Sequence, residues 1–136
     1  MEYCCLIWGS KTKKAEQEIL KIQKQAARII LDKTIKGSNS KEMFATLNWL
    51  SFTHRVFLHH AMLAHKANNN FVPPNISKYF ITCKGNTQYN LRSSTMNNLY
   101  KERLHSKSTI NKTIDVWNSL PQYLKQPQPV TQFKNN

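Results

Sequence analysis

Residues 15–31 carry the pattern that most limits how this chain can fold. Their apolar side chains recur at steps of three and four residues, as on one side of a helix: Ala15, Ile19, Ile22, Ala26, Ala27, Ile29 and Ile30. Basic side chains recur in the same way on another face: Lys14, Lys21, Lys24 and Arg28. At 1.5 Å per residue the segment predicts a rod about 25 Å long. We expect its apolar stripe to pack against a protein domain and its basic face to bind a charged partner.

Further helices are expected in the first half of the chain. The apolar segment 3–9 stops at Gly9, which is typical of a helix end, and we interpret it as the last turns of a helix. Asn39, followed three residues later by Glu42, resembles a capping box that opens a short helix. Residues 53–67 predict another helix, with these side chains toward the core: Val56, Phe57, His60, Leu63 and Ala64.

The second half of the chain is expected to be less regular. Pro73 and Pro74 predict a short helical turn. Residues 83–94 lose the helical period and predict an extended segment, and 95–112 fit either a basic helix or a loop with a short strand. A short helix around Trp117 should end before Pro121. The expected fold is therefore mainly α: a small helical bundle, then an extended segment and a C-terminal part of short helices.

The charge of the chain points to a polyanionic partner. Twenty Lys and Arg against seven Asp and Glu give a net charge of +13, which attracts nucleic acid or an anionic surface. No apolar run approaches the ~18 residues of a membrane span, and the first residues do not form a signal peptide. The three cysteines lack zinc-site spacing. We expect an intracellular protein of the cytoplasm or nucleus that binds RNA or DNA and has no membrane partner.

Autonomous catalysis is not expected. The two aspartates, Asp32 and Asp115, are far apart in the sequence, so they do not suggest a two-metal site. No glycine-rich loop is present to hold a phosphate. Four histidines fall within residues 54–65, but none are three or four residues apart, so we expect no metal site and one imidazole facing the core.

Two groups of residues are candidates for contact with nucleic acid. Each of the four basic side chains in residues 14–28 could contact a phosphate, although a solvated helix face is the alternative. Arg92 and Arg103 alternate with Tyr89 and Tyr100, which suits stacking on unpaired bases, although these tyrosines could instead anchor a loop. The tryptophans at 8, 49 and 117 are expected in the core. The candidate binding residues are Lys14, Lys21, Lys24, Arg28, Arg92 and Arg103.

The order of several motifs resembles one protein family. "WNSLP" at 117–121 is similar to a signature near the C-terminal end of reverse transcriptases from non-LTR (LINE-type, jockey-like) retrotransposons. Upstream, "YCCLIWGS" at 3–10 resembles their "YG-x-x-x-WG", and "ILKIQKQAARII" at 19–30 resembles their "L-x-x-LQ-(K/R)-RA-x-R-x-I" helix. "YNLRS" at 89–93 resembles "H-x-YNTRS", and 130–136 resembles the start of an "S-x-x-SFK" helix. The similarity runs in order along nearly the whole chain.

The resemblance implies the thumb and post-thumb portion of an RNA-directed DNA polymerase. Residues 1–70 would be the thumb-like region, truncated at its start, and 71–136 the post-thumb region. The palm, with its aspartates and Mg, would lie upstream, so this portion would hold no cofactor and would not be an enzyme as it stands. Its partners would be the upstream polymerase domain and the template–product duplex. The sequence departs from the family at Thr87, Leu91 and Gln25, and at Thr113–Ile114.

The matched motifs name a second set of residues, expected to be structural: Trp8, Gly9, Trp117, Asn118, Leu120 and Pro121. In "WNSLP" the tryptophan and leucine should pack, the polar pair should satisfy backbone groups at a helix end, and the proline should stop the helix. Two other hypotheses stay open. The chain could be a stand-alone basic helical module that binds nucleic acid or protein, or an interaction protein that holds a partner through its apolar helix faces.

Overall fold

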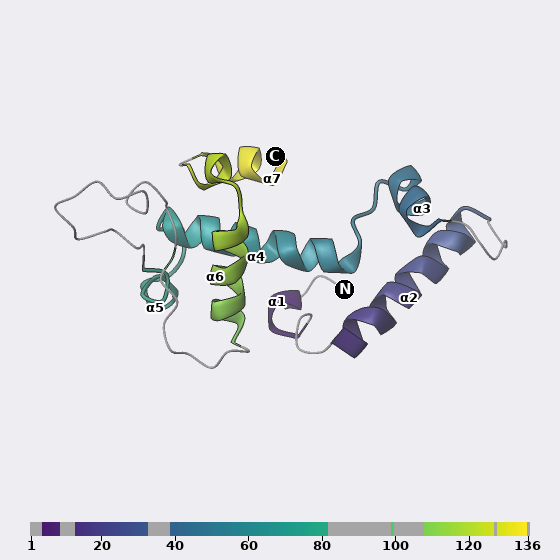
Figure 1. Ribbon diagram of the computed structural model, residues 1–136, viewed down its shortest axis with the longest axis horizontal. Helices are drawn as coiled ribbons and strands as arrows, with labels where there is room; N and C mark the ends of the chain where they lie inside the picture. The colour runs from purple at the N-terminus through teal and green to yellow at the C-terminus, as the bar shows by residue number, and fades with distance from the viewer. Residues whose placement is uncertain are drawn as a thin grey trace. The chain divides into compact units, whose positions relative to one another are not determined.

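The computed structural model describes residues 4–8, 13–32, 39–81, 99, 108–126 and 128–135 (Figure 1). These residues form helices and no strands, so the expectation of a mainly helical chain is confirmed. The helices are α1 (Cys5–Trp8), α2 (Lys13–Ile30), α3 (Ser40–Thr46), α4 (Phe52–Asn68), α5 (Pro74–Ser77), α6 (Thr109–Ser119), the 3-10 turn η2 (Gln122–Lys125) and α7 (Val130–Asn135). None of the helices in this described part is long and apolar enough to cross a membrane.

The chain divides into two compact units, residues 1–57 and 58–136, and α4 begins in the first and ends in the second. The assignment of 1–70 as a thumb-like region and 71–136 as a post-thumb region remains a prediction. The expected extended segment 83–94 lies outside the described residues.

The first unit is built on α2, with α3 packed beside it (Figure 1). Ala27 of α2 is fully buried against Met43 and Phe44 of α3, and four partly buried side chains surround them: Leu20, Leu31, Leu47 and Trp49. The methyl side chain of Ala27 leaves room for α3 to approach. The line of side chains that packs on α3, which we call the buried line, therefore runs through Leu20 and Ala27 of α2 to Leu31 just after the helix.

The apolar stripe of α2 lies mostly in solvent. The exposed fractions are 50% for Ile22, 79% for Ile29 and 58% for Ile30. Ile19 is half-buried and packs on a second small cluster of Cys5, Phe52 and Val56. Among the described residues, α3 and the start of α4 cover only an edge of the stripe.

Both loops that follow α3 and α4 have the same helix-ending geometry. After α3, Asn48 has a left-handed φ of 52°, its N–H donates to Ala45 O, and the N–H of Trp49 donates to Phe44 O at 2.7 Å. This is a Schellman motif, and asparagine is the non-glycine residue that best tolerates the left-handed conformation. Asn70 repeats the motif after α4, as the last of three consecutive asparagines at 68–70.

The helix α4 matches the prediction for 53–67 with one correction. Val56, His60 and Ala64 are buried as expected, and Leu63 is half-buried, but Phe57 is 44% exposed. Phe57 lies in the second turn of α4, and burial along its line of the helix begins only one turn later, at Ala61.

The core of the second unit forms where α6 crosses α4 (Figure 1). Three alanines of α4 present a smooth surface to large side chains from the other segments: Phe80, Leu99, Ile114, Trp117 and Phe133. The ring of His65 stacks on that of Phe133, with their centroids 4.3 Å apart. His65 is almost fully buried, which the sequence reasoning did not anticipate.

Candidate nucleic-acid interface

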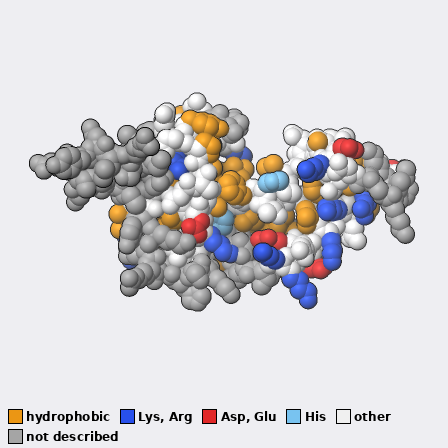
Figure 2. Space-filling view, in the orientation of Figure 1, with side chains coloured by type: hydrophobic (Ala, Val, Ile, Leu, Met, Phe, Trp, Pro, Cys, Tyr) orange, Lys and Arg blue, Asp and Glu red, His pale blue; other side chains and the backbone are white. Residues whose placement is uncertain are grey.

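Three of the predicted cations form an exposed row on α2. Lys14, Lys21 and Arg28 are spaced seven residues apart, which is about two helical turns and about 10.5 Å of rise. All three are exposed, and Figure 2 shows Lys and Arg side chains gathered over α2. The Nζ of Lys21 lies 3.0 Å from Glu18 Oε1, but both side chains are exposed, and such pairs contribute little. We call these three residues the basic row.

The fourth predicted cation, Lys24, belongs to a different feature. It lines a hollow of about 440 Å³ together with Lys41 of α3 and His54 of α4. Leu20, Phe44 and Trp49 form apolar parts of the wall, and none of the described residues that line the hollow is Asp or Glu. We call it the basic hollow. Lys41 and His54 were missed in the sequence because three segments bring them together and they share no spacing.

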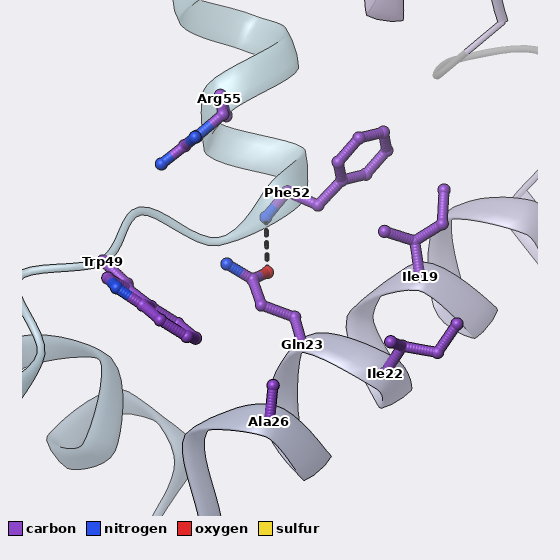
Figure 3. Close-up of a pocket in the computed structure, with 7 residues that line it drawn as sticks. All are labelled: Ile19, Ile22, Gln23, Ala26, Trp49, Phe52 and Arg55. Carbon is purple, nitrogen blue, oxygen red and sulfur yellow. Dashed lines mark hydrogen bonds between the residues drawn. The ribbon is translucent and has the colours of Figure 1, made fainter. Parts of the chain in front are cut away.

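Gln23 fixes the connection that carries Trp49. Its Nε2 donates to Leu50 O at 2.8 Å. Its Oε1 accepts from the N–H of Phe52 at 2.9 Å, as Figure 3 shows. The second bond satisfies one of the free N–H groups at the start of α4. Ser51 caps the same helix, since its Oγ accepts weakly from the N–H of His54 at 3.4 Å. Sequence reasoning missed Gln23, and the signal that could have found it is an amide beside the apolar stripe of α2.

A second hollow, of about 320 Å³, lies on the other side of Gln23. Ile19, Ile22 and Ala26 of α2 line one side, and these residues line the other: Trp49, Phe52 and Arg55 (Figure 3). We call it the apolar hollow. Trp49 lines both hollows and is half-buried, so it is not wholly a core residue as the sequence suggested.

The sequence also predicted eight other residues, two as binding residues and six as structural ones. Arg92, Arg103 and Gly9 lie outside the described residues, and Trp8 ends α1. The other four are in the second unit, at the end of α6: Trp117, Asn118, Leu120 and Pro121.

The end of α6 is a hydrogen-bonded corner. Trp117 is fully buried, and the side-chain amide of Asn118 exchanges two hydrogen bonds with the backbone of Leu99, at 3.0 and 3.1 Å. Lys125 is buried and donates from Nζ to Asn118 O at 3.0 Å, and burial lowers the pKa of its ammonium group. Pro121 precedes η2, so the chain turns directly after the helix.

His60 is the most strongly perturbed titratable group in the described part of the chain. Its Nδ1 lies 2.8 Å from the hydroxyl of Thr113, which in turn donates to Thr109 O at 2.8 Å. Since that hydroxyl proton goes to Thr109 O, we assign the ring proton of His60 to Nδ1, and Nε2 has no hydrogen-bond partner among the described residues. Burial, with help from Lys112 and His59, lowers the pKa of His60 to about 4. A neutral imidazole is therefore part of this core.

Across the described residues, no three His, Cys, Asp or Glu side chains are grouped so that they could hold a metal ion. The residues described here bring together cations, one indole and apolar walls. Comparison with the models of known protein families, with curated proteins and with solved structures gives no match to this chain.

Proposed function

We propose that this protein binds nucleic acid through the basic row of α2. The observation that carries the proposal is the exposure of Lys14, Lys21 and Arg28 on one line of an 18-residue helix. A rod with cations at regular intervals can follow a sugar-phosphate strand, and each neutralised phosphate releases counterions. The first unit carries ten Lys and Arg against five acids, so the field around α2 attracts a polyanion.

Salt dependence tests this proposal quantitatively. The three phosphate contacts of the basic row should contribute about −2.7 to the log–log slope of affinity against salt on a duplex, and about −2.1 on a single strand. Binding of a labelled oligonucleotide would be measured by fluorescence anisotropy at several salt concentrations. The triple variant with glutamine at Lys14, Lys21 and Arg28 should lose most of that slope.

A matched control removes the same charge elsewhere. Lys66→Gln, Lys78→Gln and Lys134→Gln together take three cations from the second unit. Since all three lie outside α2, this control should keep the slope that the basic row supplies. Equal slopes for the native protein and the α2 variant, or equal losses for the two triple variants, would refute the assignment to α2.

We propose further that the protein is the C-terminal, thumb and post-thumb part of a non-LTR retrotransposon reverse transcriptase. The support is the order of the sequence motifs, from 3–10 through "WNSLP" to 130–136. In that role it would contact template–product nucleic acid and contain no polymerase site of its own. Genomic sequence upstream of the coding region tests this, because it should encode, in frame, a hairpin with an aspartate pair.

A second candidate function is binding of a protein partner. It is favoured by the exposed apolar stripe of α2, in which Ile22 and Ile29 are 50% and 79% exposed. Exposed apolar patches of this kind often mark interaction sites. The double variant Ile22→Gln, Ile29→Gln should abolish a partner interaction detected by cross-linking in cells, while the salt slope for nucleic acid stays unchanged.

A further inference from the structure

Trp49 is held in place by the backbone on both of its sides. Its own N–H closes the Schellman motif after α3, and the next residue, Leu50, is bonded to Gln23 of α2. One part of its side chain packs on the cluster of Ala27, Met43 and Phe44. The rest borders the two hollows. An aromatic side chain anchored in this way offers a binding surface that loses little freedom when a ligand arrives.

The basic hollow places cations around that aromatic side chain. Lys24 comes from the middle of α2 and Lys41 from the first turn of α3, so two different helices supply lysines to the wall of one hollow. Among the described residues, neither lysine has an acidic partner, and no acid lines the hollow. A volume of about 440 Å³ falls in the range of small-ligand sites, which is roughly 300–1,000 Å³.

We infer that the basic hollow holds one nucleotide of a single strand, with its base stacked on Trp49 and its phosphates beside Lys24 and Lys41. The inference deepens, and rests on, the proposed function of nucleic-acid binding by α2. The combination of an indole, two unpaired ammonium groups and apolar walls fits a ligand that is flat and apolar at one end and anionic at the other. A nucleotide in a flexible strand has both properties.

The ligand should be a single strand rather than a duplex. A base inside a duplex is covered by its neighbours, and exposing its face for stacking costs free energy. A single strand presents every base without that cost. Lys14, Lys21 and Arg28 lie on a different line of α2 from Lys24, so they can bind the adjoining backbone while the hollow takes a base.

Native protein and two short DNA probes provide the first test. One probe is a thymidine hexamer, and the other has the same length and charge but contains abasic sites in place of the bases. Base stacking on one aromatic residue should make the thymidine hexamer bind about 5- to 100-fold more tightly. Binding of the abasic probe measures the backbone contacts alone. Equal affinity for the two probes overturns the nucleotide site and leaves the proposed function of the basic row standing.

Variants at the hollow provide the second test. Trp49→Leu should remove the preference for the thymidine hexamer over the abasic probe, and Trp49→Phe should keep most of it, since phenylalanine still stacks. Lys24→Gln with Lys41→Gln should make the salt slope shallower by about 1.4 on the single strand. Thermal melting of each variant identifies loss of folding, and the two-probe comparison on native protein does not depend on any variant. A base preference that survives Trp49→Leu in a folded protein overturns the inference.

Discussion

Protonation of His60 should destabilise the second unit as the pH falls. The native state keeps this imidazole neutral, because burial lowers its pKa to about 4, whereas the unfolded chain takes up a proton near the ordinary value of 6.5. The contribution of the neutral His60 to the free energy of unfolding is therefore fully present above pH 6.5 and is lost as the pH falls toward 4. The gap between the two pKa values corresponds to a total loss of about 3 kcal/mol.

Most of that loss is already reached at moderate acidity. At pH 4.5 the linkage relation gives a loss of roughly 2.5 kcal/mol relative to pH 7 from His60 alone. Burial also lowers the pKa of His65, so this second imidazole acts in the same direction below its ordinary pKa. A substitution is needed to isolate His60. In His60→Leu the apolar side chain fills the buried space and cannot take up a proton.

The assay is urea denaturation at pH 7 and pH 4.5, followed by circular dichroism. His60→Leu should change the free energy of unfolding at pH 7 by no more than about 1.5 kcal/mol, because one hydrogen bond is lost and one buried bare nitrogen is removed. Between pH 7 and pH 4.5, the free energy of unfolding of His60→Leu should fall by roughly 2.5 kcal/mol less than that of the native protein.

The variant Thr113→Val tests the hydrogen bond of His60 separately from the protonation of its imidazole. It removes the acceptor of His60 Nδ1 and should destabilise the protein at both pH values by about 1 to 3 kcal/mol, because a buried donor is left unpaired. The imidazole still titrates, so the loss between pH 7 and 4.5 should persist. If His60→Leu and the native protein lost equal stability over this interval, the assignment of a buried neutral imidazole would be refuted.

Three further predictions concern the connections that position the core and the interface. Asn48→Ala should destabilise the protein by about 1 kcal/mol in urea denaturation, because alanine tolerates the left-handed φ of 52° less well, whereas Asn48→Gly should be neutral or stabilising. Gln23→Leu should cost about 1 to 2 kcal/mol, since Leu50 O and the N–H of Phe52 lose their partner, and it should also weaken base-dependent binding of the thymidine hexamer. Asn118→Ala should cost about 1 to 3 kcal/mol, and an unchanged melting temperature would contradict the corner described at the end of α6.

The positions of the helices could be predicted from the sequence because their signals are local. The period of residues 15–31 marks α2, and Pro74 and Pro121 mark a helix start and a helix stop. The asparagines after α4 likewise mark its end. Each of these signals acts within a few residues, through helix geometry or through a fixed φ.

The buried line of α2 could not be predicted in the same way. The apolar stripe is centred on Ile22 and Ala26, but the buried line passes through Ala27 and Leu20, nearer the basic side. The cause is tertiary: α3 approaches where a small side chain permits it, and no periodicity in α2 contains that information. The basic hollow was missed for the same reason, since Lys41 and Lys24 meet only after α3 has packed.

The three lines along α2 explain why charge variants and Trp49 variants should have separable effects. On the helix circumference, the buried line lies between the basic row and the apolar stripe. Trp49 packs on this buried line, so the basic hollow adjoins it on the side of Lys24 and the apolar hollow on the side of Ala26. Substitutions in the basic row should therefore change the salt slope without disturbing the indole of Trp49. Loss of the indole removes a wall of both hollows and leaves the row of exposed charges in place.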